Sequence, residues 1–445
     1  MPTDDLGTAD QRATPPEMST STAPARTKQA SAFSALRHRD FTIFWIAAVV
    51  SNAGGWMQII ALPAIVYDIT GKATWLGLVS LAGLIPSVIV TPMSGALADR
   101  FSRRALLMVT QSVLMSSSFA LWALYSAGHL KPWMILVVSV VNGAASGLNF
   151  PVWNAFIPLL VPPSDLVYAI RLNSMQFTAG RVIGPTMAAA VIGISGPGAA
   201  IFVNAVTFLL VLGALVIVNP RSHGVTKGGE SVWASVSTGA QFMWKYKPLR
   251  MVCLLALVNS MFGQVLVQLA PAVSNRVFEH PSTDNAELIL ALGFGSMIAS
   301  VLVVTRGDLL RRSHQTLFVL ASYVLGLGAL SVTHSWHVGL VFFAVVGYGQ
   351  LSTAVMCNTL VQQLSPESMR GRAVSFYMLG AMTGSPLGAL ITGRIADTFT
   401  MRTALFIDAI AVTVIGVAIL WIGSHRWLDT DEVQGVDDPL LAAVS

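Results

Sequence analysis

The sequence predicts an all-α integral membrane protein with twelve transmembrane helices in two pseudo-symmetric six-helix bundles. Three observations predict this fold class. Only 11% of the 445 residues are charged, against about 25% in a typical soluble protein. Apolar runs of roughly 20 residues, the length of helix that crosses a bilayer core, recur along the chain. The two halves of the chain also resemble one another on either side of a polar central stretch.

Twelve apolar runs mark the expected spans. They lie near residues 41–67, 75–98, 105–127, 133–160, 168–195, 199–219, 250–275, 285–304, 315–333, 337–362, 372–395 and 402–424. The longest polar interruption follows the sixth run and contains "SVWASVSTGAQFMW", which has the pattern of a short interfacial amphipathic helix. We therefore expect five regions: a disordered cytoplasmic tail (1–37), an N-terminal bundle (38–219), a cytoplasmic linker (220–248), a C-terminal bundle (249–424) and a short acidic cytoplasmic tail (425–445).

The basic residues predict the orientation of these spans. If both termini are cytoplasmic, 20 of the 26 Lys and Arg residues lie on the cytoplasmic side, and the exceptions are Lys72, Lys131, Arg181, Arg276, Arg394 and Arg402. This is the positive-inside pattern of a multi-pass protein of the cell (inner) membrane. It accounts for the net charge of +5 without a nucleic-acid partner.

The similarity between the halves is weak but in register. Arg171 opens "RLNSMQFTAGRVIGPTMAAAVI" and Arg372 opens "RAVSFYMLGAMTGSPLGALITG", with Gly184-Pro185 and Ser385-Pro386 at the same spacing. Duplicated halves joined by a linker are typical of secondary transporters, whose substrate site lies near the membrane midplane between the halves.

Motifs for other chemistries are absent from the sequence. The Gly-Lys pair of "ITGKATW" lacks the remaining residues of a phosphate-binding loop, and no nucleophile elbow stands beside a plausible base. Cys253 and Cys357 lie in separate apolar runs, and no His, Cys or acidic cluster has metal-ligand spacing. We expect no enzymatic activity, no cofactor and no metal ion.

Charge is concentrated in "GALADRFSRR", residues 95–104, directly after the second run. Arg100, Arg103 and Arg104 suit the carbonyl end of a helix at the cytoplasmic face. Asp99 is on the unfavourable side of that helix dipole and needs a partner. Gly95, four residues earlier, would let a neighbouring backbone come close.

This stretch resembles the loop Gly-x-x-x-Asp-Arg-x-Gly-Arg-Arg between the second and third helices of the major facilitator superfamily, with Ser102 in place of the inner glycine. With "LRHRDFTIFWIAAVVSNAGGWMQ", the chain is most similar to the bacterial branch that contains the enterobactin exporter and the macrolide efflux pumps. The resemblance covers residues 34 to 424. It implies that Asp99 closes a cytoplasmic gate against the start of the eleventh helix, at Gly371-Arg372, and so stabilises an outward-facing state.

The fifth run carries "GRVIGP". Small residues four apart, Gly180 and Gly184, indicate close helix packing. Together with Pro185 they also resemble the core of the family's antiporter motif, with Ala188 and Ala189 in place of its last glycines. That resemblance favours export over uptake.

Arg181 is expected roughly 15 to 20 Å inside the membrane, because it lies about 10 to 13 residues into its helix. A charge there costs at least about 2.5 to 3.5 kcal/mol, so such residues usually face a cavity. We expect Arg181 to bind substrate or to take part in coupling. The alternative is a structural ion pair with a buried acid.

Polar residues on other spans extend this expected cavity. They are Asn142, Asn149 and Trp153 on one face of the fourth span, Asn52 and Trp56 in the first, and Gln264 and Gln268 in the seventh. Hydrogen bonding between helices accounts for any one of them alone. Together they favour a large amphipathic cavity for bulky solutes.

The sequence thus predicts a monomeric secondary transporter that exports a drug-like or siderophore-like organic solute by alternating access. Its partners would be the solute, protons and membrane lipid. Asp408 is the clearest acid inside a span, but no proton carrier is identified. The alternatives are an uptake permease for a small metabolite and a non-transporting receptor or scaffold.

Overall fold

The computed structural model describes residues 34–220, 241, 244, 247–306 and 312–422, and most of them are helical. The α-helices are α1 (Arg39–Thr70), α2 (Thr74–Val90), α3 (Met93–Arg100), α4 (Arg103–Ser126), α5 (Pro132–Phe156), α6 (Leu166–Ile217), α8 (Lys247–Val258), α9 (Val265–Phe278), α10 (Asn285–Arg306), α11 (Arg312–Val332), α12 (Trp336–Leu364), α13 (Glu367–Thr398) and α14 (Met401–Ile422). Short 3-10 helices are η1 (Ser34–Arg37), η2 (Ile157–Leu159), η3 (Pro163–Asp165) and η5 (Ser282–Asp284), and η4 (Asn259–Gly263) is a π-helix.

The all-helical class is confirmed, and the helices follow the apolar runs of the sequence. Ten segments of the described chain are long and apolar enough to cross a membrane. This number differs from the twelve expected spans in two places. α2 has only 17 residues, and the fifth and sixth runs are joined in one helix, α6, of 52 residues.

α6 is broken inside its length at Gly196. Gly196 has φ 78° and ψ 171°, which only glycine adopts without strain, and Pro197 follows it. The break lies between the expected runs 168–195 and 199–219. The seventh run is also interrupted, because η4 separates α8 from α9. Of the predicted linker helix, residues 231–244, only 241 and 244 are described, and both are helical.

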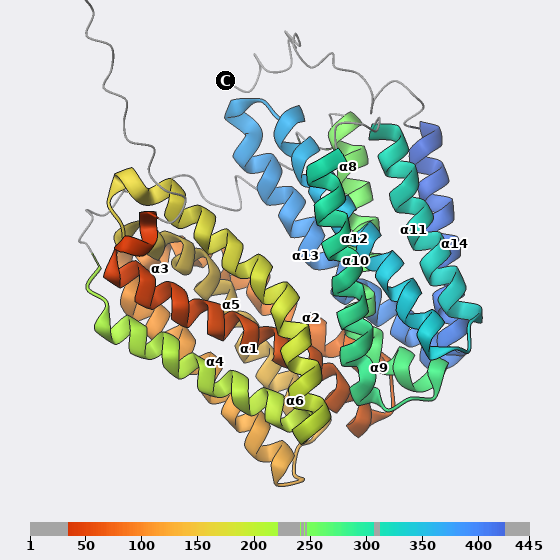
Figure 1. Ribbon diagram of the computed structural model, residues 1–445, viewed down its shortest axis with the longest axis horizontal. Helices are drawn as coiled ribbons and strands as arrows, with labels where there is room; N and C mark the ends of the chain where they lie inside the picture. The colour runs from red at the N-terminus through yellow and green to blue at the C-terminus, as the bar shows by residue number, and fades with distance from the viewer. Residues whose placement is uncertain (1–33, 221–240, 242–243, 245–246, 307–311, 423–445) are drawn as a thin grey trace, which may run out of the picture.

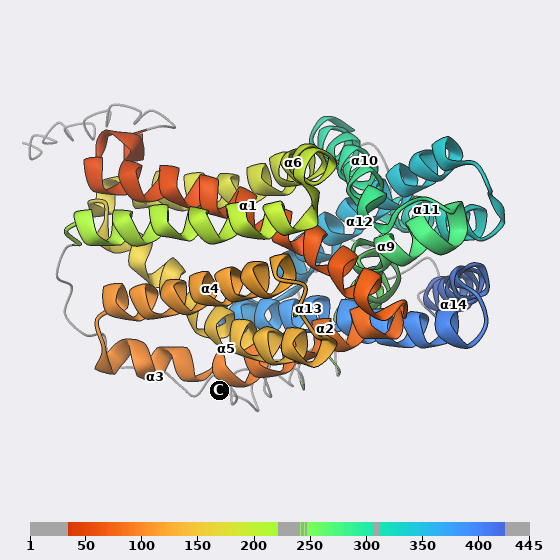
Figure 2. The ribbon, with the colours of Figure 1, turned by 90° about the horizontal axis from the view of Figure 1, so that it is seen from below.

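Two groups of helices stand side by side in Figure 1. We call α1–α6 the N-terminal group and α8–α14 the C-terminal group. They contact each other through α2 with α13, α6 with α10, and α1 with α9 and α10. Figure 2 shows α13 running along α2 at the junction.

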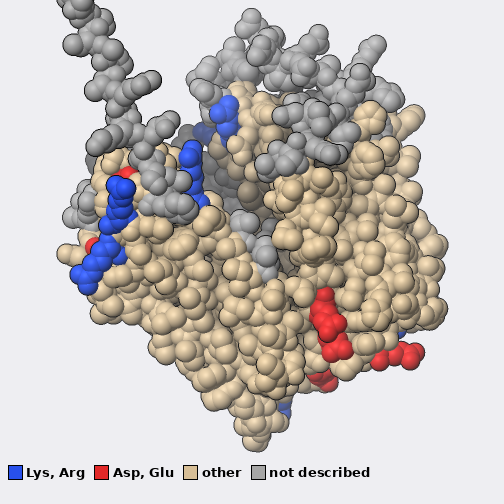
Figure 3. Space-filling view, in the orientation of Figure 1, with Lys and Arg blue, Asp and Glu red and all other residues tan. Residues whose placement is uncertain are grey.

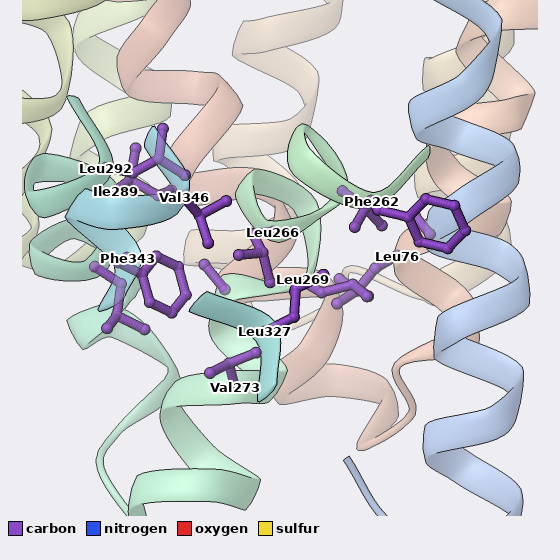
Figure 4. Packing of buried hydrophobic residues seen from close by; sticks show 14 of the residues in the cluster. Leu76, Phe262, Leu266, Leu269, Val273, Ile289, Leu292, Leu327, Phe343 and Val346 are labelled. Atoms are coloured by element: carbon purple, nitrogen blue, oxygen red, sulfur yellow. The ribbon is translucent and has the colours of Figure 1, made fainter. Parts of the chain in front are cut away.

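The junction has two ends. At the α1–α2 end lie the connections 71–73, 279–281 and 399–400, and at the α3–α4 end lie the start of α1 and residues 101–102. The larger apolar cluster joins both groups, and Figure 4 shows Leu76 of α2 beside Leu269 of α9 and Phe262 of η4. Toward the α3–α4 end, Figure 3 shows a hollow between the groups with Lys and Arg side chains at its rim. The junction is therefore closed at one end and open at the other.

Candidate functional site

The polar face of α5 is divided between packing and the interior of the junction. Asn149 Oδ1 accepts hydrogen bonds from Thr110 Oγ1 (2.9 Å) and Gln111 Nε2 (3.2 Å) of α4. Trp153 Nε1 donates to Asn173 Oδ1 of α6 at 3.2 Å. These contacts agree with the alternative of hydrogen bonding between helices.

Trp153 also belongs to a second apolar cluster, inside the N-terminal group. Its side chain is 7% exposed, and its ring centroid lies 4.5 Å from that of Phe44. An aromatic ring held in this way contributes area and shape to the core. The structure therefore gives Trp153 a packing contact inside the N-terminal group, and its predicted role in binding stays a prediction.

Asn142 lies on the same helix but differs from Asn149 and Trp153, whose side chains are hydrogen-bonded to neighbouring helices. Its Oδ1 atom is buried and accepts no hydrogen bond from any residue that the structure describes. A buried acceptor of this kind costs about 1 to 3 kcal/mol unless water or a ligand bonds to it. Asn142 is the member of the predicted polar face that best fits a binding role.

The predicted glycine pair of α6 packs against two other predicted residues, both on α1. A Cβ atom at Gly180 would lie 2.7 Å from Asn52 Nδ2, and one at Gly184 would overlap Trp56 Cβ. Asn52 Nδ2 also donates to Gln176 O at 3.0 Å. The sequence signal of close packing is therefore matched by a contact between α1 and α6.

Pro185, which follows this pair, is buried within α6. Arg181 lies in the same stretch of helix, one residue after Gly180. Its side chain lies outside the described part of the structure, so its predicted role stays a prediction.

A second glycine pair makes the corresponding contact in the C-terminal group. A Cβ atom at Gly384 of α13 would lie 2.6 Å from Ser260 Cβ, and one at Gly388 would overlap Met261 O, both in η4. Ser260 Oγ donates to Ala381 O at 2.6 Å. The signal was present in "GSPLG", which has the same four-residue spacing as "GRVIG".

The predicted glutamines lie just after η4, Gln264 directly and Gln268 four residues later in α9. Gln268 Nε2 donates to Ser385 Oγ of α13 at 2.9 Å, and its Oε1 atom is buried without a hydrogen-bond partner among the described residues. Gln264 is the C-terminal cap residue of η4 and is half-buried. π-Helical turns are rare and often lie at functional sites, so this junction of η4 with α13 is a candidate lining of the hollow.

Three polar residues that sequence reasoning missed join the helices of the N-terminal group. Gln58 Oε1 accepts from Ser118 Oγ of α4 (2.8 Å) and from Asn204 Nδ2 of α6 (2.6 Å). Gln58 and Asn204 are lone polar residues in apolar runs, and Ser118 ends a run of three serines; these were the available signals. Because both donors come from different helices, Gln58 holds three helices together.

The arginines of the predicted gating loop bind the ends of other helices. Arg103 Nη1 donates to Ala155 O of α5 (2.9 Å), and Arg104 Nη2 donates to Val216 O of α6 (2.6 Å). Ser102, in the place of the family's glycine, caps α4 by accepting from Ala105 N. Arg100 is exposed at the last position of α3. These contacts fix the loop to the N-terminal group.

The contact of Asp99 with Gly371-Arg372, expected from the sequence, stays a prediction. Gly95 and Asp99 belong to α3, although their side chains lie outside the described part. The sequence suggested that the eleventh helix starts at Gly371, but α13 begins four residues earlier, at Glu367. Figure 1 shows α3 in the N-terminal group and α13 in the C-terminal group.

Other kinds of site are not indicated by the described residues. Among them, no three His, Cys, Asp or Glu side chains are placed to hold a metal ion. A pocket of about 320 Å³ at the α1–α2 end, lined by Trp122, Tyr125 and Phe202 among others, contains none of the predicted site residues. The hollow between the groups is therefore the candidate site.

Comparison with known proteins identifies the family. The sequence pattern of the major facilitator family described as transmembrane secretion effectors matches residues 30–443. The chain belongs to this family. It is a membrane transporter and not an enzyme.

Similar proteins span nearly the whole chain. The multidrug efflux pump Tap of Mycolicibacterium fortuitum is 22% identical over 394 residues, covering 86% of this chain and 95% of its own. The enterobactin exporter of Salmonella typhi is 22% identical over 388 residues, covering 86% and 92%. The solved structure of the nucleoside transporter NupG superposes with a TM-score of 0.70 at 13% identity, covering 87% of this chain and 100% of its own. These matches agree with the branch that the sequence resembled.

Proposed function

We propose that this protein is a secondary active transporter that exports a drug-like or siderophore-like organic solute by alternating access. The family is described as transmembrane secretion effectors, and the similar proteins include a multidrug efflux pump and an enterobactin exporter. The observation that carries the mechanism is the junction itself, which is closed at the α1–α2 end and hollow at the α3–α4 end. Alternating access requires such one-sided closure.

The α3–α4 end is proposed to face the cytoplasm. Among the described residues, nine basic side chains lie toward this end: Arg37, Arg39, Arg100, Arg103, Arg104, Arg171, Arg250, Arg370 and Arg372. Five lie toward the other: Lys72, Lys131, Arg276, Arg394 and Arg402. The excess on one side supports cytoplasmic termini in the cell membrane and makes this state inward-facing.

Twelve crossings are proposed from the lengths of the helices. α6 has 52 residues and would be roughly 78 Å long at 1.5 Å per residue, more than twice the hydrocarbon core. Its break at Gly196 divides it into two crossings, while α2 with α3 and α8 with α9 form one crossing each. With these counts the groups are two six-helix bundles over 38–219 and 249–424, in a monomer.

The substrate is proposed to bind in the hollow, between α5 and α6 of one group and η4 and α9 of the other. Asn142 and Gln268 each present a buried acceptor without a described partner, and Gln264 lies four residues before Gln268. Asn52 and Trp56 shape the wall through the glycine pair of α6. Arg181 is proposed to meet the substrate or the coupling ion.

Proton coupling is proposed from the family's antiporter motif. The described acid deepest inside the helices is Asp408 of α14, which is 3% exposed and accepts from Thr392 Oγ1 at 2.9 Å. Asp408 lies where α14 contacts α13, so a proton moving between Asp408 and the hollow would have to pass α13.

An accumulation screen tests the function. The gene is expressed in a bacterial host without its own major efflux pumps, and cell-associated dyes and antibiotics are measured with and without an uncoupler. We expect lower accumulation of at least one amphipathic compound, restored by the uncoupler. Higher accumulation would indicate an uptake permease. If the protein changes the accumulation of no compound, and Arg181→Ala also changes none, the receptor or scaffold is favoured.

A further inference from the structure

The end of α13 repeats the sequence of the gating loop at the opposite end of the molecule. Residues 95–104 read "GALADRFSRR" and residues 393–402 read "GRIADTFTMR". Gly, Ala, Asp, Phe, a hydroxyl residue and Arg occur in the same order at the same spacing. The first stretch ends α3 at the α3–α4 end, and the second ends α13 at the α1–α2 end.

The backbone of the two stretches is alike. Phe101 and Phe399 are the C-cap residues of α3 and α13, and the N–H of each donates to the carbonyl four residues earlier at 2.9 Å. Ser102 caps α4 by accepting from Ala105 N (3.2 Å), and Thr400 caps α14 by accepting from Thr403 N (3.1 Å). The similarity therefore extends from sequence to hydrogen bonds.

The last arginine of each stretch donates to backbone carbonyls at the end of another helix. Arg104 donates to Val216 O at the end of α6. Arg402 donates to Val277 O (2.8 Å) at the end of α9 and to Thr333 O (2.7 Å) just after α11. Both guanidinium groups satisfy the carbonyls that a helix end leaves unpaired. Inverted repeats of this kind are a known building plan of transporters.

Asp397, at the position of Asp99, crosses the junction. Its Oδ1 accepts from Ala73 N at 2.9 Å, and its Oδ2 accepts from Thr74 N (2.8 Å) and Thr74 Oγ1 (2.6 Å). The carboxylate of the C-terminal group thus caps the first turn of α2, in the N-terminal group. An anion at a helix N-terminus is stabilised by the unpaired N–H groups and by the helix dipole.

Arg276 reinforces this contact from α9. Its Nη2 lies 2.8 Å from Asp397 Oδ1 and donates to Gly71 O at 2.6 Å, and its Nε donates to Tyr67 OH at 2.8 Å. The guanidinium therefore also joins both groups. Separating them at this end would leave Asp397 without the cap of α2, and Arg276 without its partners on α1.

The helices come close enough for this only because of glycine. A Cβ atom at Gly77 of α2 would overlap the backbone of Leu390, and one at Gly393 would lie 2.6 Å from Ala73 O. Gly393 stands four residues before Asp397, as Gly95 stands four residues before Asp99. The glycine of the repeated pattern is the point of backbone contact at the closed end.

We propose that Asp397 is the gate residue of the α1–α2 end, the inverted counterpart of Asp99, and that it holds the state described here by capping α2. It is a positioning residue and not a substrate ligand. The proposal rests on the alternating access of the proposed function. Each half of the cycle then has its own aspartate, one at each end of the α2 and α13 pair.

Labelling of a buried cysteine tests this gate. Ala389→Cys, fully buried beside Gly77, is introduced with Cys253→Ala and Cys357→Ala, and whole cells are treated with a membrane-impermeant maleimide. We expect slow labelling in this parent and labelling at least about fivefold faster after Asp397→Asn, the lower range of typical coupling between two states. Thr74→Val, which removes one donor, should act in the same direction by less, and Asp397→Glu should stay closer to the parent.

The matched control is Asp284→Asn. Asp284 is an acid at the same end whose carboxylate pairs with His280 inside the C-terminal group, so its loss should leave the rate unchanged. If Asp397→Asn and Thr74→Val label no faster than the parent, or if Asp284→Asn labels as fast as they do, the gate is overturned. Solute accumulation is measured in the same cells. Faster labelling in a protein that exports nothing would leave the gate standing and remove the proposed function.

Discussion

The two ends of the junction between the helix groups carry the same sequence pattern in different structural situations. At the α1–α2 end, Asp397 caps α2 and pairs with Arg276, and apolar residues from both groups pack beneath them. At the α3–α4 end, the matching stretch is fixed to its own group by Arg103 and Arg104, across a hollow from the start of α13. Arginine contacts to helix ends therefore occur at both ends, and at the closed end Asp397 also joins the two groups.

Contacts within each group are of another kind. Glycine pairs seat α1 on α6 and η4 on α13, and Gln58 joins three helices. Nothing in these contacts crosses the junction. In the proposed alternating access, each group would move as a unit while the polar contacts at one end are exchanged.

The largest effect is expected from a side chain that prevents α2 from packing against α13. In Gly77→Val, the side chain would overlap the backbone of Leu390, which cannot yield as a side chain can. We expect the α1–α2 end to stay open and export to fall at least tenfold, since overpacking costs about 1 to 3 kcal/mol or more. Solute efflux rate measures this, with Gly55→Ala, whose Cβ would meet nothing within 4 Å, as the control. Equal efflux in Gly77→Val and the control would show that this end need not close.

The glycine pairs inside the groups should respond differently. Gly184→Ala and Gly388→Ala would press on Trp56 and on the backbone of Met261. We expect both substitutions to lower the free energy of unfolding by about 1 to 3 kcal/mol, seen as a lower melting temperature of the purified protein. Neither should change the rate of cysteine labelling at either end. Gly193→Ala is the control, because nothing lies within 4 Å of its Cβ position. A shift in labelling with unchanged stability would contradict the separation of the two kinds of contact.

Gln58→Leu tests the hydrogen bonds within the N-terminal group. Ser118 Oγ and Asn204 Nδ2 would each lose their acceptor, and we expect a loss of about 1 to 2 kcal/mol of stability. Thermal denaturation in detergent measures it. Gln362→Leu, at an exposed position of α12, is the control, and an equal loss there would indicate a general effect of the substitution.

Trp153→Phe separates packing from substrate binding. The substitution keeps most of the ring contact with Phe44 and removes only the hydrogen bond to Asn173, worth about 0.5 to 1.5 kcal/mol. We expect a small loss of stability and an unchanged range of exported compounds. A changed range of exported compounds would support the predicted role of Trp153 in substrate binding.

The smallest effect concerns the start of the chain's first helix. Hydrogen bonds from His38 and Ser34 lower the pKa of Asp165, which joins η1 to η3 at the α3–α4 end. A lowered pKa stabilises the folded protein above the usual value of about 4 and loses this contribution as the pH falls through the folded value. The melting temperatures of the parent and Asp165→Asn should therefore differ at pH 7 and converge below about pH 4. A difference that grows on acidification would contradict this.

The sequence predicted most of the helices, because only long apolar helices satisfy the backbone in lipid. It also predicted the close packing at Gly180 and Gly184. It did not predict η4, since a π-helix has no sequence signature in a run as apolar as its neighbours. For Trp153, periodicity places the residue on one face of α5, and only its hydrogen bond to Asn173 shows that α6 lies against it.

Asp397 was overlooked although its signal was in the sequence. In the same direction along the chain, Asp308 and Arg312 have the spacing of Asp99 and Arg103, and Asp308 lies outside the described residues. An inverted repeat places the second copy at the other end of the molecule. Only the contact of Asp397 with Ala73 and Thr74 shows which helix the aspartate meets.

Distances between spin labels at the two ends test the central claim most directly. One pair, Lys72→Cys with Thr398→Cys, spans the α1–α2 end, and another, Arg39→Cys with Arg370→Cys, spans the α3–α4 end; all four positions are exposed. Each pair is measured in lipid by pulsed electron resonance in the parent and in Asp397→Asn. We predict that the substitution lengthens the first distance and shortens the second. Two distances that change in the same direction, or that both stay fixed, would contradict alternating closure of the two ends.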